Sequence, residues 1–223
     1  MSSAVLPQRT SNPGSPSSSL ALALTLGSVW AGSPIPLALG AAGFMGAMLY
    51  RAGHFTLPNV ITFSRLVLFV SALLVAPQNV LVVLPCALLA LILDGVDGWL
   101  ARKRGQVTEF GALFDQETDA ALVLLLCVAL MVTRGFGPWV LIAGLLRYAL
   151  VLVRTFARGP IAERRSSLGR FIFGFSYLSL TFALSPAFDS VSLFTVPASV
   201  LLLLYSFAPD FLAVARARAV SPG

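Results

Sequence analysis

Apolar residues come in long blocks along this chain, and each block is about as long as a helix that crosses a bilayer. A hydrocarbon core of about 30 Å needs about 20 apolar residues in an α-helix. A transmembrane barrel would instead show short alternating segments. From residue 57 onward the blocks predict six spans, at about 57–76, 79–101, 111–133, 137–157, 169–186 and 191–213. The pattern therefore predicts an all-α polytopic membrane protein with a six-transmembrane-helix core.

Turn-forming residues separate the predicted spans. Pro77 to Asn79 follows the first span, a Gly- and Pro-containing stretch at 134–138 follows the third, and Ser185-Pro186 with Asp189 follows the fifth. Glycine and proline in such positions interrupt helices and favour turns. These breaks support the division of the core into six helices.

The region before the core divides into two parts. Residues 1–18 are rich in Ser and Pro, carry one charge, and are expected to form a disordered tail. Residues 19–56 form an accessory apolar segment, which the stretch GSPIP at 32–36 interrupts. One kinked span, a short hairpin and an interfacial segment all remain open. A signal peptide is less favoured, because no clear soluble domain follows. The membrane domain is expected at 57–215, followed by a tail at 216–223.

Composition agrees with a membrane protein. The chain of 223 residues is 57% hydrophobic and 11% charged, whereas about 25% of residues are charged in an ordinary soluble domain. Its mean hydropathy is +0.89. Cys86 and Cys127 lie inside apolar blocks, which indicates small core residues rather than a disulfide or a metal pair. His54 borders the first span and is interpreted as an interfacial side chain.

The net charge of +6 is interpreted as membrane topology rather than as a surface for nucleic acid. Arg51 precedes the core and Arg216 and Arg218 end it, whereas the opposite connections carry only Arg134. The connections after spans two and four hold Arg102, Lys103, Arg104, Arg158, Arg164 and Arg165. By the positive-inside rule, these connections and both ends of the core face the cytoplasm. We therefore expect a multi-pass protein of the cell membrane.

Six of the nine acidic residues lie between Asp94 and Asp119. Carboxylates in an apolar chain are costly, so such a cluster indicates a functional site. Asp94 and Asp97 are spaced i, i+3, and Asp115 and Asp119 are spaced i, i+4. Each spacing puts two side chains on one face of a helix. A short basic connection joins the two helices, so we expect them to be antiparallel neighbours with the aspartate pairs facing each other.

Four converging carboxylates predict divalent cations with hard oxygen ligands, Mg²⁺ or Mn²⁺. Two such ions could clamp a phosphoryl group. Gly98, Ala101 and Gly111 leave room for a ligand, Arg102 could hold a phosphate bidentately, and Thr108 could supply a hydroxyl. A buried ion-pair network is the structural alternative. It would account for Arg102 with one aspartate but leaves the other aspartates with few compensating bases.

These residues carry a resemblance to a known family. The pattern D-x2-D-G-x2-A-R-x8-G-x3-D-x3-D resembles the signature of the CDP-alcohol phosphatidyltransferase family, with every element at the family spacing. Its eight defined positions are Asp94, Asp97, Gly98, Ala101, Arg102, Gly111, Asp115 and Asp119. The six-span core from residue 57 also resembles the family's fold, and the region before it is not covered.

The resemblance implies a role for each motif residue. Asp94, Asp97 and Asp115 would bind two divalent metals, and Asp119 would bind one metal and act as general base. The residues expected to contact the CDP-lipid are Gly98, Ala101, Arg102, Thr108 and Gly111. The segment LPNVITFSR also resembles the family's P-N-x2-T-x2-R entry to the first span, which adds Asn59, Thr62 and Arg65. Without the aspartate motif, Asn59 would be interpreted as a helix cap.

The implied reaction transfers a phosphatidyl group from a CDP-activated lipid, such as CDP-diacylglycerol, to a small alcohol and releases CMP. The resemblance also implies a homodimer in membrane lipid, through the membrane helices.

Arginines of span four and the residues after it predict the acceptor pocket. Arg147 and Arg154 share a helical face, Arg147 lies well inside an apolar run, and Arg170 opens span five. Basic residues in these regions often form the acceptor pocket in the family. Arginines favour an anionic acceptor, such as the polyol phosphates glycerol phosphate or inositol phosphate. The alternative is that the charges from Arg154 onward belong to cytoplasmic connections.

Glu117 is expected to point away from both metal-site aspartates of its helix and to pair with a loop arginine. The segment DQETD departs from the proline- and lysine-containing form common in the glycerophosphate-accepting branch, which puts that acceptor in doubt.

Two other functions compete with the transferase. An ion- or proton-coupled transporter could use the aspartates, but its charges would lie near the bilayer midplane on broken helices. Here they lie at the ends of spans. A catalytically inactive scaffold of the same fold is disfavoured, because all eight motif positions are intact.

Overall fold

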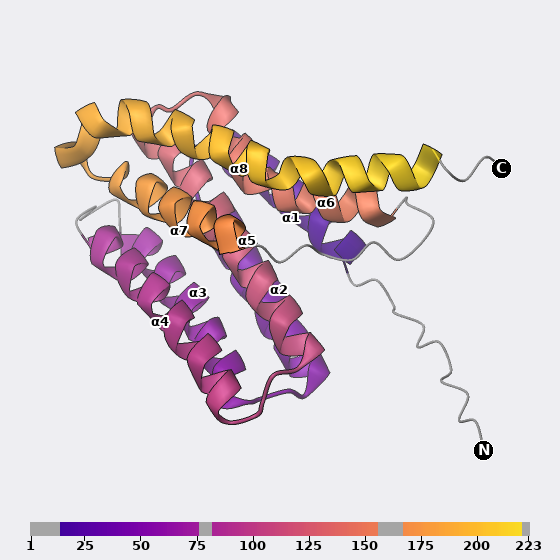
Figure 1. The fold of residues 1–223 in the computed structure, drawn as a ribbon. Coiled ribbons are helices and arrows are strands. Elements are labelled where there is room, and N and C mark those ends of the chain that lie inside the picture. Colours follow the sequence, from indigo (N-terminus) through magenta and orange to yellow (C-terminus); the bar gives the residue numbers. More distant parts are fainter. Residues whose placement is uncertain (1–13, 76–81, 156–166, 220–223) are drawn as a thin grey trace, which may run out of the picture.

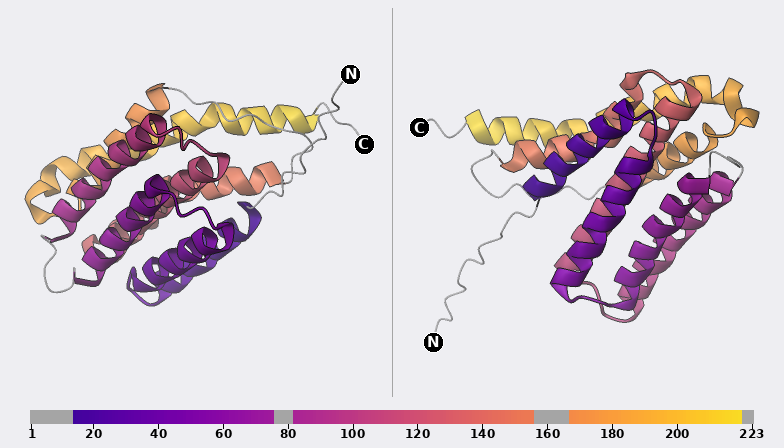
Figure 2. Two further views of the ribbon diagram at one scale, coloured as in Figure 1. Left: turned by 90° about the horizontal axis from the view of Figure 1, so that it is seen from below. Right: turned by 180° about the vertical axis from the view of Figure 1, so that it is seen from behind.

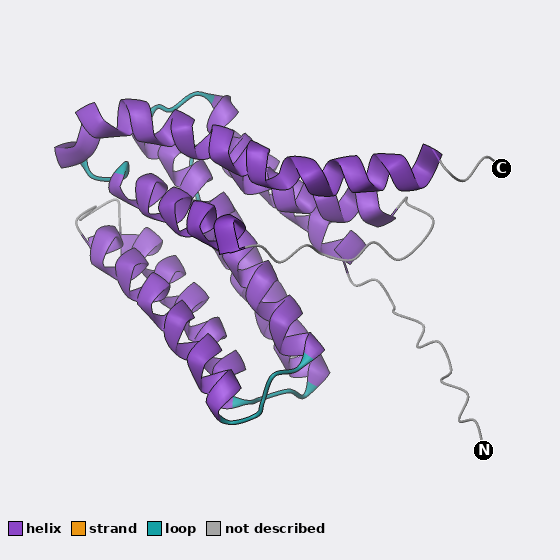
Figure 3. Ribbon diagram, in the orientation of Figure 1, coloured by secondary structure: helices purple, strands orange, loops and turns teal. Residues whose placement is uncertain are grey.

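The structure, a computed structural model, describes residues 14–75, 82–155 and 167–219. Within these ranges the chain forms helices joined by short loops and no strand (Figure 3). The α-helices are α1 (Gly14–Trp30), α2 (Ile35–Ala52), α3 (Leu57–Val75), α4 (Val83–Lys103), α5 (Glu109–Arg134), α6 (Leu141–Thr155), α7 (Ser167–Phe182) and α8 (Asp189–Ala219). Short 3₁₀ turns, η2 (Pro138–Val140) and η3 (Pro186–Phe188), precede α6 and α8. The prediction of an all-α polytopic fold is confirmed.

Each of the six predicted core spans corresponds to one helix. By length and composition, α2, α3, α4, α5 and the segment Pro186–Arg216 could each cross a membrane. Within the described residues, α6 has 15 residues and covers most of the predicted span 137–157, and α7 has 16 residues and covers most of the predicted span 169–186. The predicted turn at Pro77 to Asn79, and Arg158, Arg164 and Arg165, lie outside the described residues.

Helix α5 is the core of the bundle (Figure 1). In its most apolar window 72% of the residues are buried, more than in any other candidate span, and every residue from Ala120 to Leu130 is buried. Helices α1, α2, α3, α6 and α7 all pack against it. The helix ends at Gly135, whose φ of 69° is a left-handed conformation that glycine adopts without steric cost. Since α5 also carries Asp115 and Asp119, the site is built on the most firmly packed helix.

Helix α6 crosses α5 at very close range. A Cβ atom at Gly144 would lie 2.7 Å from the Cα atom of Leu124, so only glycine allows this approach. This contact could not be predicted from the sequence, because a single glycine inside an apolar block has no distinctive spacing.

The accessory segment forms a helical hairpin. Helices α1 and α2 pack against each other, with a turn at Gly32, whose φ is 60°. From behind, α2 covers the far side of α5, and α1 lies along α6 (Figure 2). The segment is thus a hairpin of two helices and not one kinked span, because the glycine turn lets both helices pack against the core.

Two predicted boundaries change. Helix α1 begins at Gly14, so residues 14–18 are helical rather than part of a disordered tail, and residues 1–13 lie outside the described residues. Ser17 and Ser18 are buried, and the hydroxyl of Ser18 donates a hydrogen bond to the carbonyl of Tyr148. At the other end α8 continues to Ala219, into the predicted tail at 216–223.

Helices α4 and α5 differ from the predicted arrangement. They are not closely packed neighbours, because α3 packs extensively against both of them and they make no extensive contact with each other (Figure 1). The physical reason lies in the side chains between them, where carboxylates repel and an arginine of α3 is inserted. The aspartate pairs nevertheless face each other, as the sequence predicted.

Candidate active site

The aspartates of α4 and α5 converge. Asp94, Asp97 and Asp115 can each offer one carboxylate oxygen such that the three oxygens lie within 4.8 Å of one another. Asp97 is buried, whereas Asp94 and Asp115 are partly exposed. Asp119 lies one turn further along α5 and is not part of this three-oxygen group. The predicted spacing therefore brings three of the four carboxylates to one point.

Arg65 of α3 joins all four aspartates. Its Nη1 atom lies 2.8 Å from Oδ1 of Asp94, 3.1 Å from Oδ2 of Asp97 and 3.0 Å from Oδ1 of Asp115. Its Nη2 atom lies 2.7 Å from Oδ1 of Asp119. The side chain of Arg65 is only 2% exposed. A single buried guanidinium thus links three helices.

The alternative of a buried ion-pair network is therefore partly correct, but the arginine in the network is not the expected Arg102. Arg65, not Arg102, pairs with the aspartates. Among the residues that the structure describes, no second cation pairs with them, so one guanidinium faces four carboxylates. Carboxyl groups thus outnumber cations by three in a partly buried place, where uncompensated charge is costly. Hard carboxylate oxygens with this excess charge suit Mg²⁺ or Mn²⁺, so the residues present fit the predicted metals.

The start of α3 is tied to the site by two polar side chains. The hydroxyl of Thr62 donates a hydrogen bond of 2.8 Å to Oδ2 of Asp97. The amide Nδ2 of Asn59 donates a hydrogen bond of 2.9 Å to the carbonyl of His54. Since α3 begins at Leu57, Asn59 lies inside the helix and is not its cap. The cap interpretation of Asn59 was wrong, and its side chain instead fixes the loop that precedes α3.

Gly111 lies at a close contact between α5 and α3. A Cβ atom there would be 3.1 Å from Oδ1 of Asn59 and 3.0 Å from Oγ1 of Thr108. Thr108 is the N-cap of α5, and its hydroxyl accepts a hydrogen bond of 2.9 Å from the amide of Gly111. Thr108 therefore has a structural role that the sequence analysis did not assign. Its expected contact with the CDP moiety stays a prediction.

The remaining motif residues lie in the last turns of α4. Gly98 follows Asp97, and a Cβ atom there would lie 3.4 Å from Nη1 of Arg102, an ordinary van der Waals distance. Ala101 is partly buried, and the side chain of Arg102 is exposed at the end of the helix. Arg102 is thus accessible to a ligand that approaches this end of the bundle.

The predicted acceptor arginines have different partners. Nη2 of Arg147 lies 3.1 Å from Oε1 of Gln116 and 3.3 Å from Oε1 of Glu117, both on α5. Nη2 of Arg154 lies 3.4 Å from Oδ1 of Asp210 on α8.

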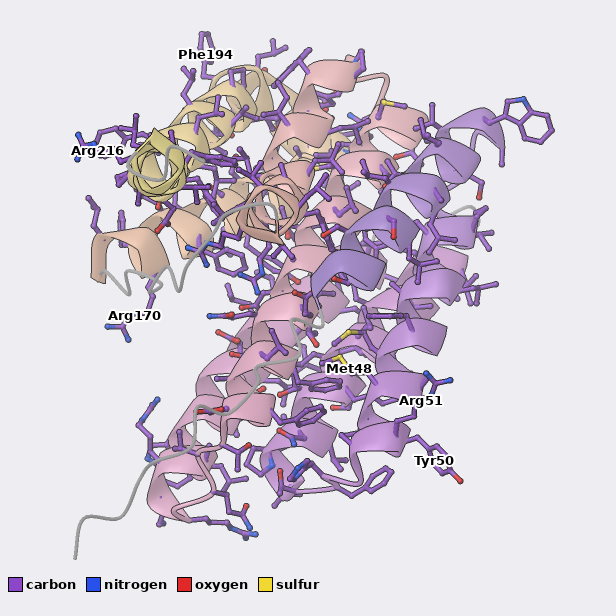
Figure 4. The ribbon with its side chains drawn as sticks, turned by 90° about the vertical axis from the view of Figure 1, so that its right-hand side faces the viewer. Met48, Tyr50, Arg51, Arg170, Phe194 and Arg216 are labelled. Atoms are coloured by element: carbon purple, nitrogen blue, oxygen red, sulfur yellow. The ribbon has the colours of Figure 1, made fainter. Side chains whose placement is uncertain are left out.

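Two expectations change with these contacts. The expected loop arginine for Glu117 is corrected to Arg147 of α6, because α6 crosses α5 closely enough for their side chains to meet. Arg170 is exposed and points outward from the start of α7 (Figure 4). Arg147 contacts α5 and Arg154 contacts α8. The grouping of these arginines with Arg170 into one pocket stays a prediction.

Sequence reasoning missed an aromatic stack next to the site. The ring of His54 stacks on Phe110 at 5.2 Å, and Phe110 stacks on Phe114 at 5.6 Å. The stack connects the loop before α3 to the first turns of α5. The i, i+4 spacing of the two phenylalanines was the available signal in the sequence.

The two cysteines, Cys86 and Cys127, are free.

This architecture defines a class: a polytopic helical membrane protein with a carboxylate site built by three of its helices. The family model for CDP-alcohol phosphatidyltransferase matches residues 55–215, so the chain belongs to that family.

Curated relatives agree with this membership. A CDP-diacylglycerol–inositol 3-phosphatidyltransferase of Schizosaccharomyces pombe is 36% identical over 80 residues, which cover 34% of each chain. A CDP-diacylglycerol–serine O-phosphatidyltransferase of Encephalitozoon cuniculi is 31% identical over 138 residues, covering 57% of this chain and 35% of the relative. A probable inositol 3-phosphatidyltransferase of Arabidopsis thaliana is 31% identical over 113 residues, or 48% and 49% of the two chains. The matches thus span between a third and a half of these relatives, and they give the transporter alternative no support.

Proposed function

We propose that this protein is a phospholipid-synthesising enzyme of the membrane. It transfers a phosphatidyl group from a CDP-activated lipid, such as CDP-diacylglycerol, to the hydroxyl of a small alcohol and releases CMP. The observation that carries the proposal is the convergence of the motif aspartates of α4 and α5 on one point, in a chain that belongs to the CDP-alcohol phosphatidyltransferase family.

The chemistry follows from the groups at this point. Asp119 accepts the proton of the acceptor hydroxyl. The resulting oxygen nucleophile forms a bond to the lipid-side phosphorus, and the bond from that phosphorus to the bridging oxygen breaks. The electron pair of the broken bond leaves with CMP. Asp119 suits this role because its carboxylate lies beside the three-oxygen group without being part of it.

Asp94, Asp97 and Asp115 would hold divalent cations, two per site with a contribution from Asp119. When bound, Mg²⁺ or Mn²⁺ neutralises the negative charge of the diphosphate and of the transition state. The exposed guanidinium of Arg102 would bind a phosphate, and the residues at the start of α3, Asn59 and Thr62, would flank the CDP moiety. Gly98 and Ala101 would leave the approach open. The expected room at Gly111 is corrected, because Gly111 packs closely against Asn59 and Thr108.

The acceptor is proposed only as a class of alcohols. Arg147 and Arg154 each face a carboxylate, so their charge is largely compensated within the protein. This weakens the argument for a polyol phosphate that rested on a cluster of arginines. The relatives are named for inositol and serine. Neutral and anionic alcohols therefore both belong in the acceptor test.

The proposed setting follows from the distribution of charge. The aspartate site lies at the end of the bundle where α4 ends and α5 begins, next to Arg102, Lys103 and Arg104. By the positive-inside rule, we expect this end of the bundle to face the cytoplasm. A homodimer is a further prediction from the family, and cross-linking in intact membranes tests it.

The deciding experiment is a transfer assay. Membranes that contain the protein are incubated with CDP-diacylglycerol radiolabelled in the lipid and with inositol, serine, glycerol phosphate or inositol phosphate, each with Mg²⁺, with Mn²⁺ or with a chelator. We expect a new labelled lipid and equimolar CMP with one acceptor, and no product with the chelator. Absence of CMP release with every acceptor would overturn the proposal.

A further inference from the structure

The position of Arg65 sets it apart from an ordinary salt-bridge partner. Nη1 carries two hydrogens, yet it lies within 3.1 Å of oxygens from Asp94, Asp97 and Asp115. These are the same three residues whose oxygens could hold a metal ion. The amino group therefore lies against the three carboxylates that a bound cation would use.

We propose that Arg65 is an internal counter-cation, which holds the four aspartates together without metal and competes with divalent cations for them. The inference rests on the metal site in the proposed function but goes beyond it, because the family resemblance assigns Arg65 to the CDP-lipid. A cation bound by Asp94, Asp97 and Asp115 would compete with Nη1 for these three carboxylates. Arg65 thereby lowers the affinity of the site for metal and keeps the metal-free site folded.

The geometry supports competition rather than simple assistance. A divalent cation and a guanidinium held by the same oxygens would repel each other at a separation of a few Å, where Coulomb energies are large even at an effective dielectric constant of about 20. Among described residues, the opposing carboxylates have no other cationic partner. Removal of the guanidinium charge should therefore raise the affinity of the site for metal and lower the stability of the metal-free protein. A purely structural role predicts only the loss of stability.

The test measures metal binding, not transfer. The full-length chain is purified in detergent without nucleotide, and Mn²⁺ affinity is measured from the electron paramagnetic resonance signal of free Mn²⁺. We expect Arg65→Gln to bind Mn²⁺ more tightly than the wild type, by on the order of tenfold or more. Without metal its melting temperature should fall below that of the wild type, and saturating Mn²⁺ should restore most of the difference. Arg65→Lys keeps the charge and should lie between the two proteins in both measurements.

Arg134→Gln is the matched control, since Arg134 pairs with Asp189 at the far end of α5. It should leave Mn²⁺ affinity unchanged. If Arg65→Gln does not fold without metal, the proposal requires that it be recovered folded when Mn²⁺ is present throughout purification. Unchanged or weaker Mn²⁺ binding by Arg65→Gln, with normal binding by the wild type, would overturn the counter-cation role alone. Absence of Mn²⁺ binding by the wild type and both Arg65 variants would overturn the metal site and this inference together.

Discussion

Arg147 and Glu117 form an ion pair between α6 and α5, with Nη2 and Oε1 3.3 Å apart and both side chains largely buried. Glu117 is two residues from both Asp115 and Asp119 in the sequence, and on a helix it points to another face. The helix at the centre of the bundle thus carries two separate carboxylate sites, and only one of them faces α4.

Loss of Arg147 is expected to act mainly on stability. Arg147→Leu removes the ion pair of the buried Glu117 with α6, and removal of one member of a buried pair costs about 3–5 kcal/mol. Glu117→Leu combined with Arg147→Leu should recover much of this loss. Thermal unfolding in detergent checks both variants. An unchanged melting temperature of Arg147→Leu together with a raised KM for the acceptor would instead support the predicted acceptor pocket.

Gly111 is expected to tolerate no side chain. Gly111→Ala places a Cβ atom about 3 Å from both Asn59 and Thr108, and such overpacking costs about 1–3 kcal/mol. The transfer rate should fall as well, because the side chain of Asn59 or the helix cap at Thr108 must move beside the site. Gly95→Ala is the control for stability: no atom lies within 4 Å of its Cβ, and alanine favours a helix by up to about 1 kcal/mol. Equal melting temperatures for the two variants would contradict this prediction.

Gly144 is expected to be needed for the crossing of α5 and α6. Because the obstacle is the backbone of Leu124 at 2.7 Å, Gly144→Ala forces the helices apart, at a cost of about 1–3 kcal/mol or more. Gly174→Ala on α7 meets no atom within 4 Å and serves as the comparison. Unfolding temperatures of the two variants in the same detergent give the result, and a loss of stability confined to Gly174→Ala would refute the packing argument.

Thr108 is expected to contribute as a helix cap whatever it contacts in the substrate. Thr108→Ala removes the acceptor of the Gly111 amide hydrogen and should cost about 1 kcal/mol, whereas Thr108→Ser should keep most of the stability. If Thr108 also contacts CDP, the alanine variant will raise the KM for CDP-diacylglycerol even where it is fully folded. A fully folded Thr108→Ala protein with an unchanged KM would limit the residue to capping.

Asp119 is expected to be indispensable to the transfer but not to the binding of ligands. Asp119→Asn should reduce turnover to background because an amide cannot accept the acceptor's proton, whereas Mn²⁺ and CDP-lipid should still bind. Equilibrium binding and single-turnover transfer separate the two effects. Asp189→Asn, at the far end of the bundle, should transfer normally. Turnover of Asp119→Asn at the wild-type rate would disprove the assignment of the base.

The sequence by itself determined the class of fold and the position of the site. Long apolar blocks dictate helices in lipid because every backbone polar group must be satisfied within its own segment. The i, i+3 and i, i+4 spacings placed each aspartate pair on one helical face, since that depends only on helical geometry. The predicted facing of Asp97 and Asp115 was therefore correct, and Asn59 and Thr62 do lie at the site.

Only the tertiary structure decided which helix lies between the aspartates and which charges pair. Helix α3, not direct contact, connects α4 and α5, and it brings Arg65 to all four carboxylates. The tertiary structure also decided that Arg147 pairs with Glu117 and that the accessory segment is a hairpin. Local periodicity shows which face of a helix is polar, but not which other helix that face will meet. That choice depends on the packing of the whole bundle, where each buried charge must find its partner.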